Sequence, residues 1–184
     1  MIALDIDGTL LGYDSYTADT PTVNLPLIRQ LAKVTRQVAL VTNQGGLPFG
    51  VMNMPRRATL EAGYVDTPVS LIPKMYPRPE FFYRRYLHLM EILHDHDIED
   101  VALRVSCFHP KAPVAAIEKA AAQVRDLFRP HLFDWKIYTT ERARKPNPFM
   151  LHSVEASIYY GDSDEDEQAA QAAGIPFVRV ERFR

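Results

Sequence analysis

The 184-residue sequence lacks several features that would place it in a specialised class of protein. It has a single cysteine, Cys107, which excludes an internal disulfide and fits a reducing compartment. No apolar run is long enough to span a bilayer. There is no internal repeat, and no low-complexity segment beyond short alanine-rich and acidic patches. A disulfide scaffold, a membrane-spanning protein and a repeat array are therefore not expected.

A strong charge of either sign is also missing. The formal net charge is −2, from 21 Lys and Arg against 23 Asp and Glu, which predicts no general attraction to nucleic acid or to anionic membranes. The first predicted strand begins at residue 2, so we expect no signal peptide and a cytoplasmic location. With 47% hydrophobic residues, the chain suits one globular domain, residues 1–184, with a sizeable core.

Apolar strand patterns alternate along the chain with amphipathic helix patterns. Strands are expected at residues 2–7, 37–41, 101–105, 133–140, 156–160 and 176–180. Helices are expected at 24–36, 80–94, 113–128, from 148 onward and in the alanine-rich segment before Gly174. This alternation predicts an α/β fold, with a mostly parallel sheet of five or six strands and helices on both faces.

The first predicted helix and the segment at residues 45–78 lead to more detailed expectations. Asn24 is predicted to cap the helix and Pro26 to lie in its first turn, with Val34 among the inward residues. In residues 45–78, Gly, Pro and Met alternate with apolar and basic residues, and a short helix is expected at 56–63. A lid or specificity loop fits such an insertion, and a packed connection or an oligomer contact fits it equally. The oligomeric state is not predicted.

Acidic and polar side chains follow the ends of three predicted strands. Asp5 and Asp7 share a face at the tip of the first strand, where two neighbouring charges need a cation or a proton. Thr42 and Asn43 end the second strand. Asp162 and Asp166 follow the strand at 156–160, and Lys145 precedes a predicted helix start. Because ligands bind beyond the carboxyl ends of parallel strands, we expect these side chains to share one site.

This set of side chains predicts a divalent-metal site for phosphoryl transfer. The four acids and Lys145 carry a formal charge of −3, which would repel a phosphate dianion. One Mg²⁺ and a proton on Asp7 neutralise that charge, and Mg²⁺ prefers carboxylate, water and phosphate oxygens. Asp5 is the predicted nucleophile and forms an aspartyl phosphate. Asp7 protonates the leaving oxygen and then activates water.

The remaining polar residues receive supporting roles. The Thr42 hydroxyl and the Asn43 backbone N–H are predicted to bind the phosphoryl oxygens, and Lys145 to neutralise their charge. Asp162 is a predicted metal ligand. Asp166 either binds the metal through water or orients Lys145. The alternatives are that Thr42 caps the following segment and that Lys145 is a solvated surface lysine.

Four motifs in this order resemble the haloacid dehalogenase superfamily, in its phosphatase branch. They are DxDGT at residues 5–9, TN at 42–43, KP at 145–146 and GDxxxD at 161–166. The resemblance implies a Rossmann-like core, Mg²⁺ dependence and an aspartyl-phosphate intermediate. It also implies that Asp7 gives its backbone carbonyl to the metal, beside Asp5, Asp162 and Asp166. The dehalogenases lack the second aspartate, so Asp7 argues against dehalogenation.

Two details narrow the resemblance. Thr42-Asn43-Gln44 and Arg144-Lys145-Pro146 are similar to the histidinol-phosphate and heptose-bisphosphate phosphatases and to the phosphatase domain of polynucleotide kinase. The first two often carry a zinc loop, and Cys107 and His109 match its first half. The second half should fall near residues 141–143, where the thiolates are missing, so zinc is not expected. This departure weakens assignment to those two substrates.

Cap modules set specificity in this family, and the sequence has little room for one. Residues 11–23 are too few for a helical cap, and residues 110–141 hold about one helix and one strand. A capless protein with an open site is therefore expected, acting on a small phosphorylated metabolite. A 3′-phosphatase on nucleic-acid ends is the alternative, from the basic and aromatic residues at 74–85. A non-hydrolysing phosphate-binding or regulatory module is the third hypothesis.

Overall fold

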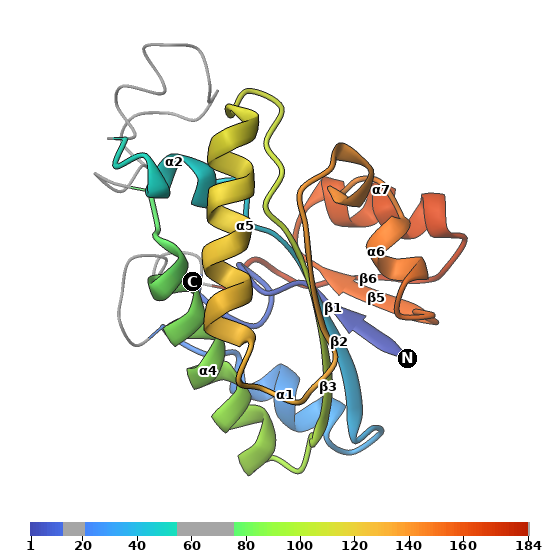
Figure 1. Ribbon diagram of the computed structural model, residues 1–184. Coiled ribbons are helices and arrows are strands. Elements are labelled where there is room, and N and C mark those ends of the chain that lie inside the picture. Colours follow the sequence, from blue (N-terminus) through green and yellow to red (C-terminus); the bar gives the residue numbers. More distant parts are fainter. Residues whose placement is uncertain (13–20, 55–75, 184) are drawn as a thin grey trace.

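Six parallel strands form one sheet at the centre of the molecule (Figure 1). The computed structural model describes residues 1–12, 21–54 and 76–183. The strands are β1 (Ile2–Leu4), β2 (Gln37–Asn43), β3 (Asp100–Ser106), β4 (Trp135–Tyr138), β5 (Ile158–Gly161) and β6 (Phe177–Arg179). The helices are α1 (Leu25–Leu31), α2 (Leu47–Val51), α4 (Pro79–Asp95), α5 (Val114–Phe128), the 3-10 turn η3 (Glu141–Ala143), α6 (Phe149–His152) and α7 (Asp164–Ala173).

The strand order is β4-β3-β2-β1-β5-β6, and every neighbouring pair is parallel. The chain builds outward from β1 to β4 and then crosses to β5 on the other side of β1. The winding direction therefore reverses between β1 and β5. In open α/β sheets, ligands bind in the crevice beyond the carboxyl ends of the strands at such a reversal. The topology thus directs attention to the loops after β1, β2 and β5.

The two faces of the sheet are covered by different sets of helices (Figure 1). On one face α1, α4 and α5 pack against bulky residues of the central strands, such as Leu4, Leu40 and Leu103. On the other face the same strands present small residues, Ala3 and Ala39 among them, beneath α6 and α7. Because side chains alternate along a strand, neighbouring residues supply both faces of this three-layer structure.

The predicted fold class is confirmed: the protein is α/β, with six strands within the expected range and a Rossmann-like core. The Asn24 cap is confirmed as well, since its Oδ1 accepts a hydrogen bond from Leu27 N at 3.3 Å and Pro26 lies in the first turn. The inward position predicted for Val34 is wrong. The helix ends at Leu31, and Val34 lies beyond it with 73% of its surface exposed.

The segment predicted as an irregular insertion begins with the short helix α2. Its residues Leu47 and Phe49 are buried, and the helix packs beside α5 (Figure 1). The helix predicted at residues 56–63, and with it the lid or specificity loop, lies outside the described residues. In the described part of the chain, α5 is the helix between β3 and β4, and no large cap domain is present.

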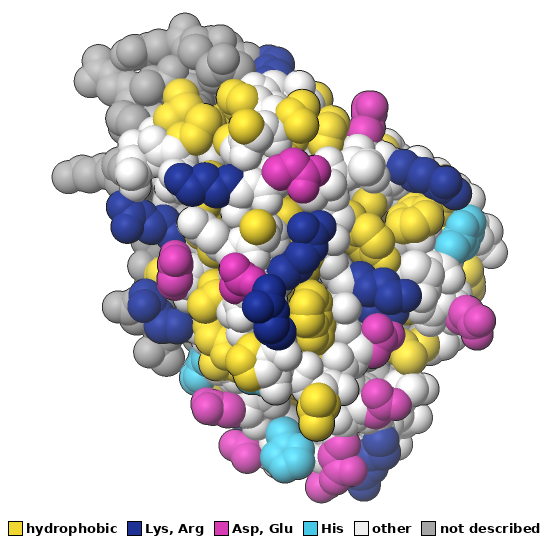
Figure 2. Space-filling model, viewed as in Figure 1, with side chains coloured by type: hydrophobic (Ala, Val, Ile, Leu, Met, Phe, Trp, Pro, Cys, Tyr) yellow, Lys and Arg dark blue, Asp and Glu magenta, His cyan; other side chains and the backbone are white. Residues whose placement is uncertain are grey.

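The surface carries both signs of charge. Acidic and basic side chains are interspersed over the face shown in Figure 2, with apolar side chains between them. This mixture agrees with the small net charge of the sequence. Among residues 1–12, 21–54 and 76–183, no helix combines the length and the apolar character needed to cross a bilayer.

Candidate active site

Asp5 and Asp7 lie in a tight turn at the carboxyl edge of β1. Strand β1 ends at Leu4, shorter than predicted, but the backbone N–H of Asp5 still donates to Tyr160 O of β5 at 2.9 Å. Gly8 follows with a φ of +88°, a conformation that favours glycine. A Cβ at Gly8 would lie 2.6 Å from Asp162 Oδ2. Glycine therefore lets the turn after β1 approach the acid after β5.

Lys145 is the centre of the site. Its Nζ donates to Asp5 Oδ1 and to Asp166 Oδ1, each at 2.6 Å, and to the Tyr159 hydroxyl at 2.9 Å. The residue is only 4% exposed, so the alternative of a solvated surface lysine is wrong. The ammonium group joins a carboxylate after β1 to a carboxylate on α7.

The side chain of Asn43 fixes the backbone on which Lys145 sits. Asn43 Oδ1 accepts from Lys145 N at 3.0 Å, while Asn43 Nδ2 donates to Lys145 O at 3.2 Å. Asn43 Nδ2 also donates to Glu165 Oε2 at 3.2 Å. The sequence suggested a role only for the Asn43 backbone. Its amide side chain additionally holds the loop that carries Lys145 against the end of β2.

Asp166 is held in place by the start of helix α7. Ser163 caps this helix, and its hydroxyl and backbone N–H both donate to Asp166 Oδ2, at 2.6 and 3.1 Å. The Tyr159 hydroxyl donates to Asp166 Oδ1 at 2.8 Å. These contacts and the ion pair with Lys145 occupy both carboxylate oxygens. Of the two predicted roles for Asp166, its geometry favours the orientation of Lys145.

Burial controls the ionisation of these groups. It raises the pKa of Asp5 to about 8, because Lys145 offsets only part of the desolvation and Asp166 adds a like charge. Burial also opposes the ionisation of Asp166, yet Lys145 and the hydrogen bonds hold the pKa of Asp166 below its usual value. Desolvation would lower the pKa of Lys145, but the charge of Asp5 keeps it well above the ordinary value. Lys145 thus favours the charged forms of both carboxylates, and for Asp5 burial outweighs this effect.

The Asp7 carboxylate has its contacts with residues outside this acidic group. Gln44 Nε2 donates to Asp7 Oδ2 at 2.7 Å, and Arg85 Nη2 lies 3.2 Å from Asp7 Oδ1. Gln44 Nε2 also donates to Thr42 Oγ1 at 3.0 Å, which links Asp7 to the predicted phosphate-binding hydroxyl. The sequence did not identify Gln44 or Arg85 as site residues. Arg85 interrupts the apolar stripe of α4, a signal that could have identified it.

Three carboxylates are close enough to share a cation. One carboxylate oxygen from each of Asp5, Asp162 and Asp166 lies within 4.8 Å of the other two. In the described part of the chain, this is the cluster of side chains that could hold a metal ion. Hard carboxylate oxygens with a net negative charge suit Mg²⁺. Arg182 Nε donates to Asp162 Oδ2 at 2.5 Å, a contact that the sequence did not suggest. This donor set fits the predicted magnesium ion.

These side chains line a cavity of about 150 Å³ at the carboxyl edge of the sheet. Its walls contain all seven predicted site residues, Asp5, Asp7, Thr42, Asn43, Lys145, Asp162 and Asp166, together with Ser163, Glu165 and Arg182. The motifs of four separate segments therefore meet in one place. The volume is suited to a small group rather than to an entire metabolite.

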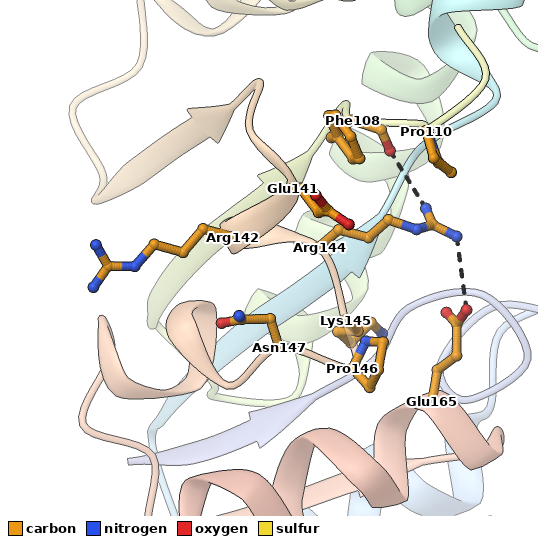
Figure 3. Close-up of a pocket in the computed structure, with 9 residues that line it drawn as sticks. All are labelled: Phe108, Pro110, Glu141, Arg142, Arg144, Lys145, Pro146, Asn147 and Glu165. Atoms are coloured by element: carbon orange, nitrogen blue, oxygen red, sulfur yellow. Dashed lines mark hydrogen bonds and ion pairs between the residues drawn. The ribbon is translucent and has the colours of Figure 1, made fainter.

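A larger cavity of about 650 Å³ adjoins this site and shares Lys145 and Glu165 with it. Figure 3 shows Arg144 reaching across this cavity, where its Nη1 donates to Phe108 O at 3.4 Å and its Nη2 lies 3.7 Å from Glu165 Oε1. The Arg142 side chain points away from Arg144 (Figure 3). The larger cavity therefore offers charged and apolar surface beside the carboxylate site.

Cys107 and His109 have other partners. Cys107 is fully buried in the core, where desolvation raises the pKa of its thiol to about 12. His109 packs edge-on against Phe49, and burial and the nearby charge of Arg144 lower the pKa of His109 to about 4. His109 Nδ1 accepts from the backbone N–H of Lys111 at 3.1 Å. Neither residue belongs to the carboxylate group that could bind a metal ion.

The basic and aromatic stretch at residues 74–85 is described from Tyr76 onward. Tyr76 and Phe82 are buried, which leaves their rings with little surface for stacking on bases. Arg85 is buried against Asp7. Phe82 belongs to the core and the partly buried Tyr83 packs against it, as their helical spacing suggested, while Phe81 is half-buried.

No family model, curated protein or solved structure matches this sequence. What the chain does is therefore inferred from its motifs and from the side chains gathered at the carboxyl edge of the sheet.

Proposed function

We propose that this protein is a Mg²⁺-dependent phosphomonoesterase of the haloacid dehalogenase type. The observation that carries the proposal is the convergence of Asp5, Thr42, Lys145 and Asp162 on one cavity at the reversal of the strand order. Each of the four comes from a different motif of the predicted set. A merely structural role for Asp5 and Lys145 is disfavoured, because a buried ion pair often costs more than apolar side chains in the same place.

The proposed reaction has two steps. In the first, an Asp5 oxygen bonds to phosphorus while the ester P–O bond breaks, and the leaving oxygen keeps that electron pair and takes a proton from Asp7. In the second, a water oxygen bonds to phosphorus while the bond between Asp5 and phosphorus breaks, and Asp7 takes a proton from that water. Phosphate is released and the Asp5 carboxylate is restored. Lys145 and the Thr42 hydroxyl stabilise the charge on the transferring phosphoryl oxygens.

The metal ion would be held by the Asp5 and Asp162 carboxylates, while Asp166 orients Lys145. By resemblance, the Asp7 backbone carbonyl completes the protein ligands. The ion supplies positive charge that offsets the acids and the phosphate and helps to orient the phosphate. Arg182 contacts one oxygen of the Asp162 carboxylate, so this arginine and the ion would compete for the negative charge of Asp162.

The substrate proposed is a small phosphorylated metabolite. The site cavity suits a phosphoryl group, and the adjoining cavity of about 650 Å³ is in the range of small-molecule pockets. Arg144 and Glu165 at the border of the two cavities can contact polar groups of the alcohol portion. A cytoplasmic location is proposed with it, from the single cysteine.

The test is hydrolysis of p-nitrophenyl phosphate by wild type, with Mg²⁺ and with EDTA, and by Asp5→Asn. We expect activity that needs Mg²⁺ and falls by at least about a thousandfold in the variant, since the nucleophile is lost. Asp134→Asn is the matched control, because Asp134 lies at the edge strand β4 and pairs with Arg104 outside the site. Activity that survives EDTA or Asp5→Asn contradicts the mechanism.

A panel of phosphate esters, with a 3′-phosphorylated oligonucleotide among them, then identifies the substrate. Turnover of the oligonucleotide well above that of nucleoside monophosphates supports the alternative 3′-phosphatase. Binding of Mg²⁺ and phosphate analogues without hydrolysis of any ester supports the non-hydrolysing module. No motif position is substituted, which favours the enzyme over that module.

A further inference from the structure

The Asp7 carboxylate contacts two residues, Gln44 from the Thr42-Asn43-Gln44 segment and Arg85 from helix α4, which belongs to no motif. Gln44 Nε2 contacts one carboxylate oxygen at 2.7 Å, and Arg85 Nη2 lies 3.2 Å from the other. Both partners are buried. Gln44 binds its oxygen by a hydrogen bond, whereas Arg85 Nη2 and Asp7 Oδ1 form an ion pair without hydrogen-bond geometry. Together the two contacts restrict rotation of the carboxylate. Its oxygens are therefore held at set positions relative to the rest of the site.

The position of Arg85 is unusual for its helix. Phe82, Tyr86 and Leu89 form the buried stripe of α4, and Arg85 lies in that stripe with only 4% of its surface exposed. Placing a charge there is costly, so a partner and a reason for it are expected. The space among Asp7, Phe82, Arg85 and their neighbours is only about 10 Å³. That is about the smallest space that holds one water molecule, so the contact sits in tight packing.

Gln44 connects the Asp7 carboxylate to Thr42, the predicted phosphate-binding residue. The same Nε2 that donates to Asp7 Oδ2 also donates to Thr42 Oγ1 at 3.0 Å. One amide group therefore sets the separation between the carboxylate of Asp7 and the hydroxyl of Thr42. In the proposed reaction Thr42 contacts the phosphoryl oxygens, so this separation fixes Asp7 relative to the bond that breaks.

We propose that Arg85 and Gln44 are positioning residues that hold Asp7 where it can protonate the leaving oxygen. The inference rests on the proposed phosphatase function and extends it to residues on α4 and after β2. As the ester P–O bond breaks, its electron pair stays on the leaving oxygen, and Asp7 supplies the proton that this oxygen takes. Orientation of Asp7 therefore matters most when the leaving oxygen is strongly basic.

The dependence on the leaving group separates positioning from a merely structural role. p-Nitrophenolate is a weak base and leaves without a proton, whereas phenolate and p-methoxyphenolate are stronger bases. A variant with a misplaced Asp7 loses activity in proportion to leaving-group basicity. A variant that is only less stable loses the same fraction with every substrate.

The experiment measures kcat/KM for p-nitrophenyl, phenyl and p-methoxyphenyl phosphate with wild type, Arg85→Met and Gln44→Met. We expect less than about threefold loss with p-nitrophenyl phosphate. With the two basic leaving groups we expect a loss of about tenfold or more, a fraction of the 10²–10⁴ that general acid catalysis contributes. Met keeps an unbranched apolar stem in both packed positions, and two variants keep the test open if one does not fold.

Arg104→Met is the matched control. Arg104 is also a buried arginine, 2% exposed, and it pairs with Asp134 at 2.5 Å on the far side of β2 from Asp7. Its loss removes a buried charge without touching the site, so the ratio between the substrates should stay that of wild type. Thermal unfolding confirms that each variant is folded at the assay temperature.

The outcomes separate the two levels of inference. Wild type that hydrolyses the whole series, with equal losses across it in folded Arg85→Met and Gln44→Met, overturns the positioning role and leaves the phosphatase standing. The positioning role is also overturned if the ratio of kcat/KM between the substrates changes in Arg104→Met as much as in Arg85→Met and Gln44→Met. Wild type that hydrolyses none of the three esters with Mg²⁺ overturns the phosphatase and the positioning role together.

Discussion

Replacing Lys145 with Met removes the only protein cation that contacts two buried acids at once among the described residues. The Nζ lies 2.6 Å from both Asp5 and Asp166, and all three side chains are almost completely buried. Breaking a buried ion pair by removing one partner costs about 3–5 kcal/mol. Folded domains are stable by about 5–15 kcal/mol, so the variant should lose a large part of its stability without metal.

The loss should depend on pH, and its sign follows from proton binding. In wild type, burial raises the pKa of Asp5 to about 8, while Lys145 holds the pKa of Asp166 low. Without Lys145, folding brings Asp5 and Asp166 together with no positive charge between them. The pKa of each acid in the folded state then rises, so the folded state keeps protons that the unfolded state releases. Stability consequently falls as pH rises. The deficit should be smallest near pH 5 and grow as the pH rises to about 8 and beyond, because loss of Lys145 raises the pKa of both acids in the folded state.

Urea unfolding followed by circular dichroism, in EDTA at about pH 5.5 and about pH 8.5, measures this deficit. Added Mg²⁺ should stabilise the variant more than wild type, because a dication replaces the missing ammonium group. Lys136→Met, the same change at an exposed position of β4, should stay within about 0.5 kcal/mol of wild type. A Lys145→Met deficit below about 1 kcal/mol, or one equal at both pH values, refutes the reasoning.

Three further predictions concern the metal site and the core. Arg182→Ala should tighten Mg²⁺ binding about fivefold, as measured by calorimetry. This factor corresponds to about 1 kcal/mol, the value of a charged hydrogen bond to Asp162 from an arginine side chain that is 49% exposed. Arg129→Ala is the control, because Arg129 pairs with Asp126 on α5 outside the cavity, and an equal effect in both variants contradicts the prediction. Mg²⁺ affinity should rise with pH up to about 8, since the ion must displace the Asp5 proton, and titrations in two buffers should show proton release. The Cys107 thiol, fully buried and with its pKa raised to about 12, should react with iodoacetamide only after unfolding.

Local patterns in the sequence were sufficient for the fold class and for most of the elements. Strand and helix periodicity depends on near neighbours, so the alternating elements and the Asn24 cap could be predicted without tertiary contacts. Ends of elements were less predictable. Helix α1 stops at Leu31, and β1 ends before its acidic tip, because tertiary contacts at each end decide how far regular structure continues.

The site was predictable where residues follow strand ends and unpredictable where long-range contacts decide. Asp5, Thr42 and Asp162 each follow an apolar strand, and parallel topology brings such ends together. The Arg85 contact with Asp7 and the Arg182 contact with Asp162 join segments that no spacing rule connects. They depend on the packing of α4 and on the path of the chain after β6.

The order of residues alone shows which acids follow the strand ends, and that a cation or a proton must accompany Asp5 and Asp7, because like charges two residues apart repel. How those charges are balanced depends on the folded chain. It placed Lys145 between Asp5, 140 residues away, and Asp166, and it turned Asp7 toward Gln44 and Arg85. Coulomb interactions depend on the distance between charges and on their burial, and the packed chain sets both.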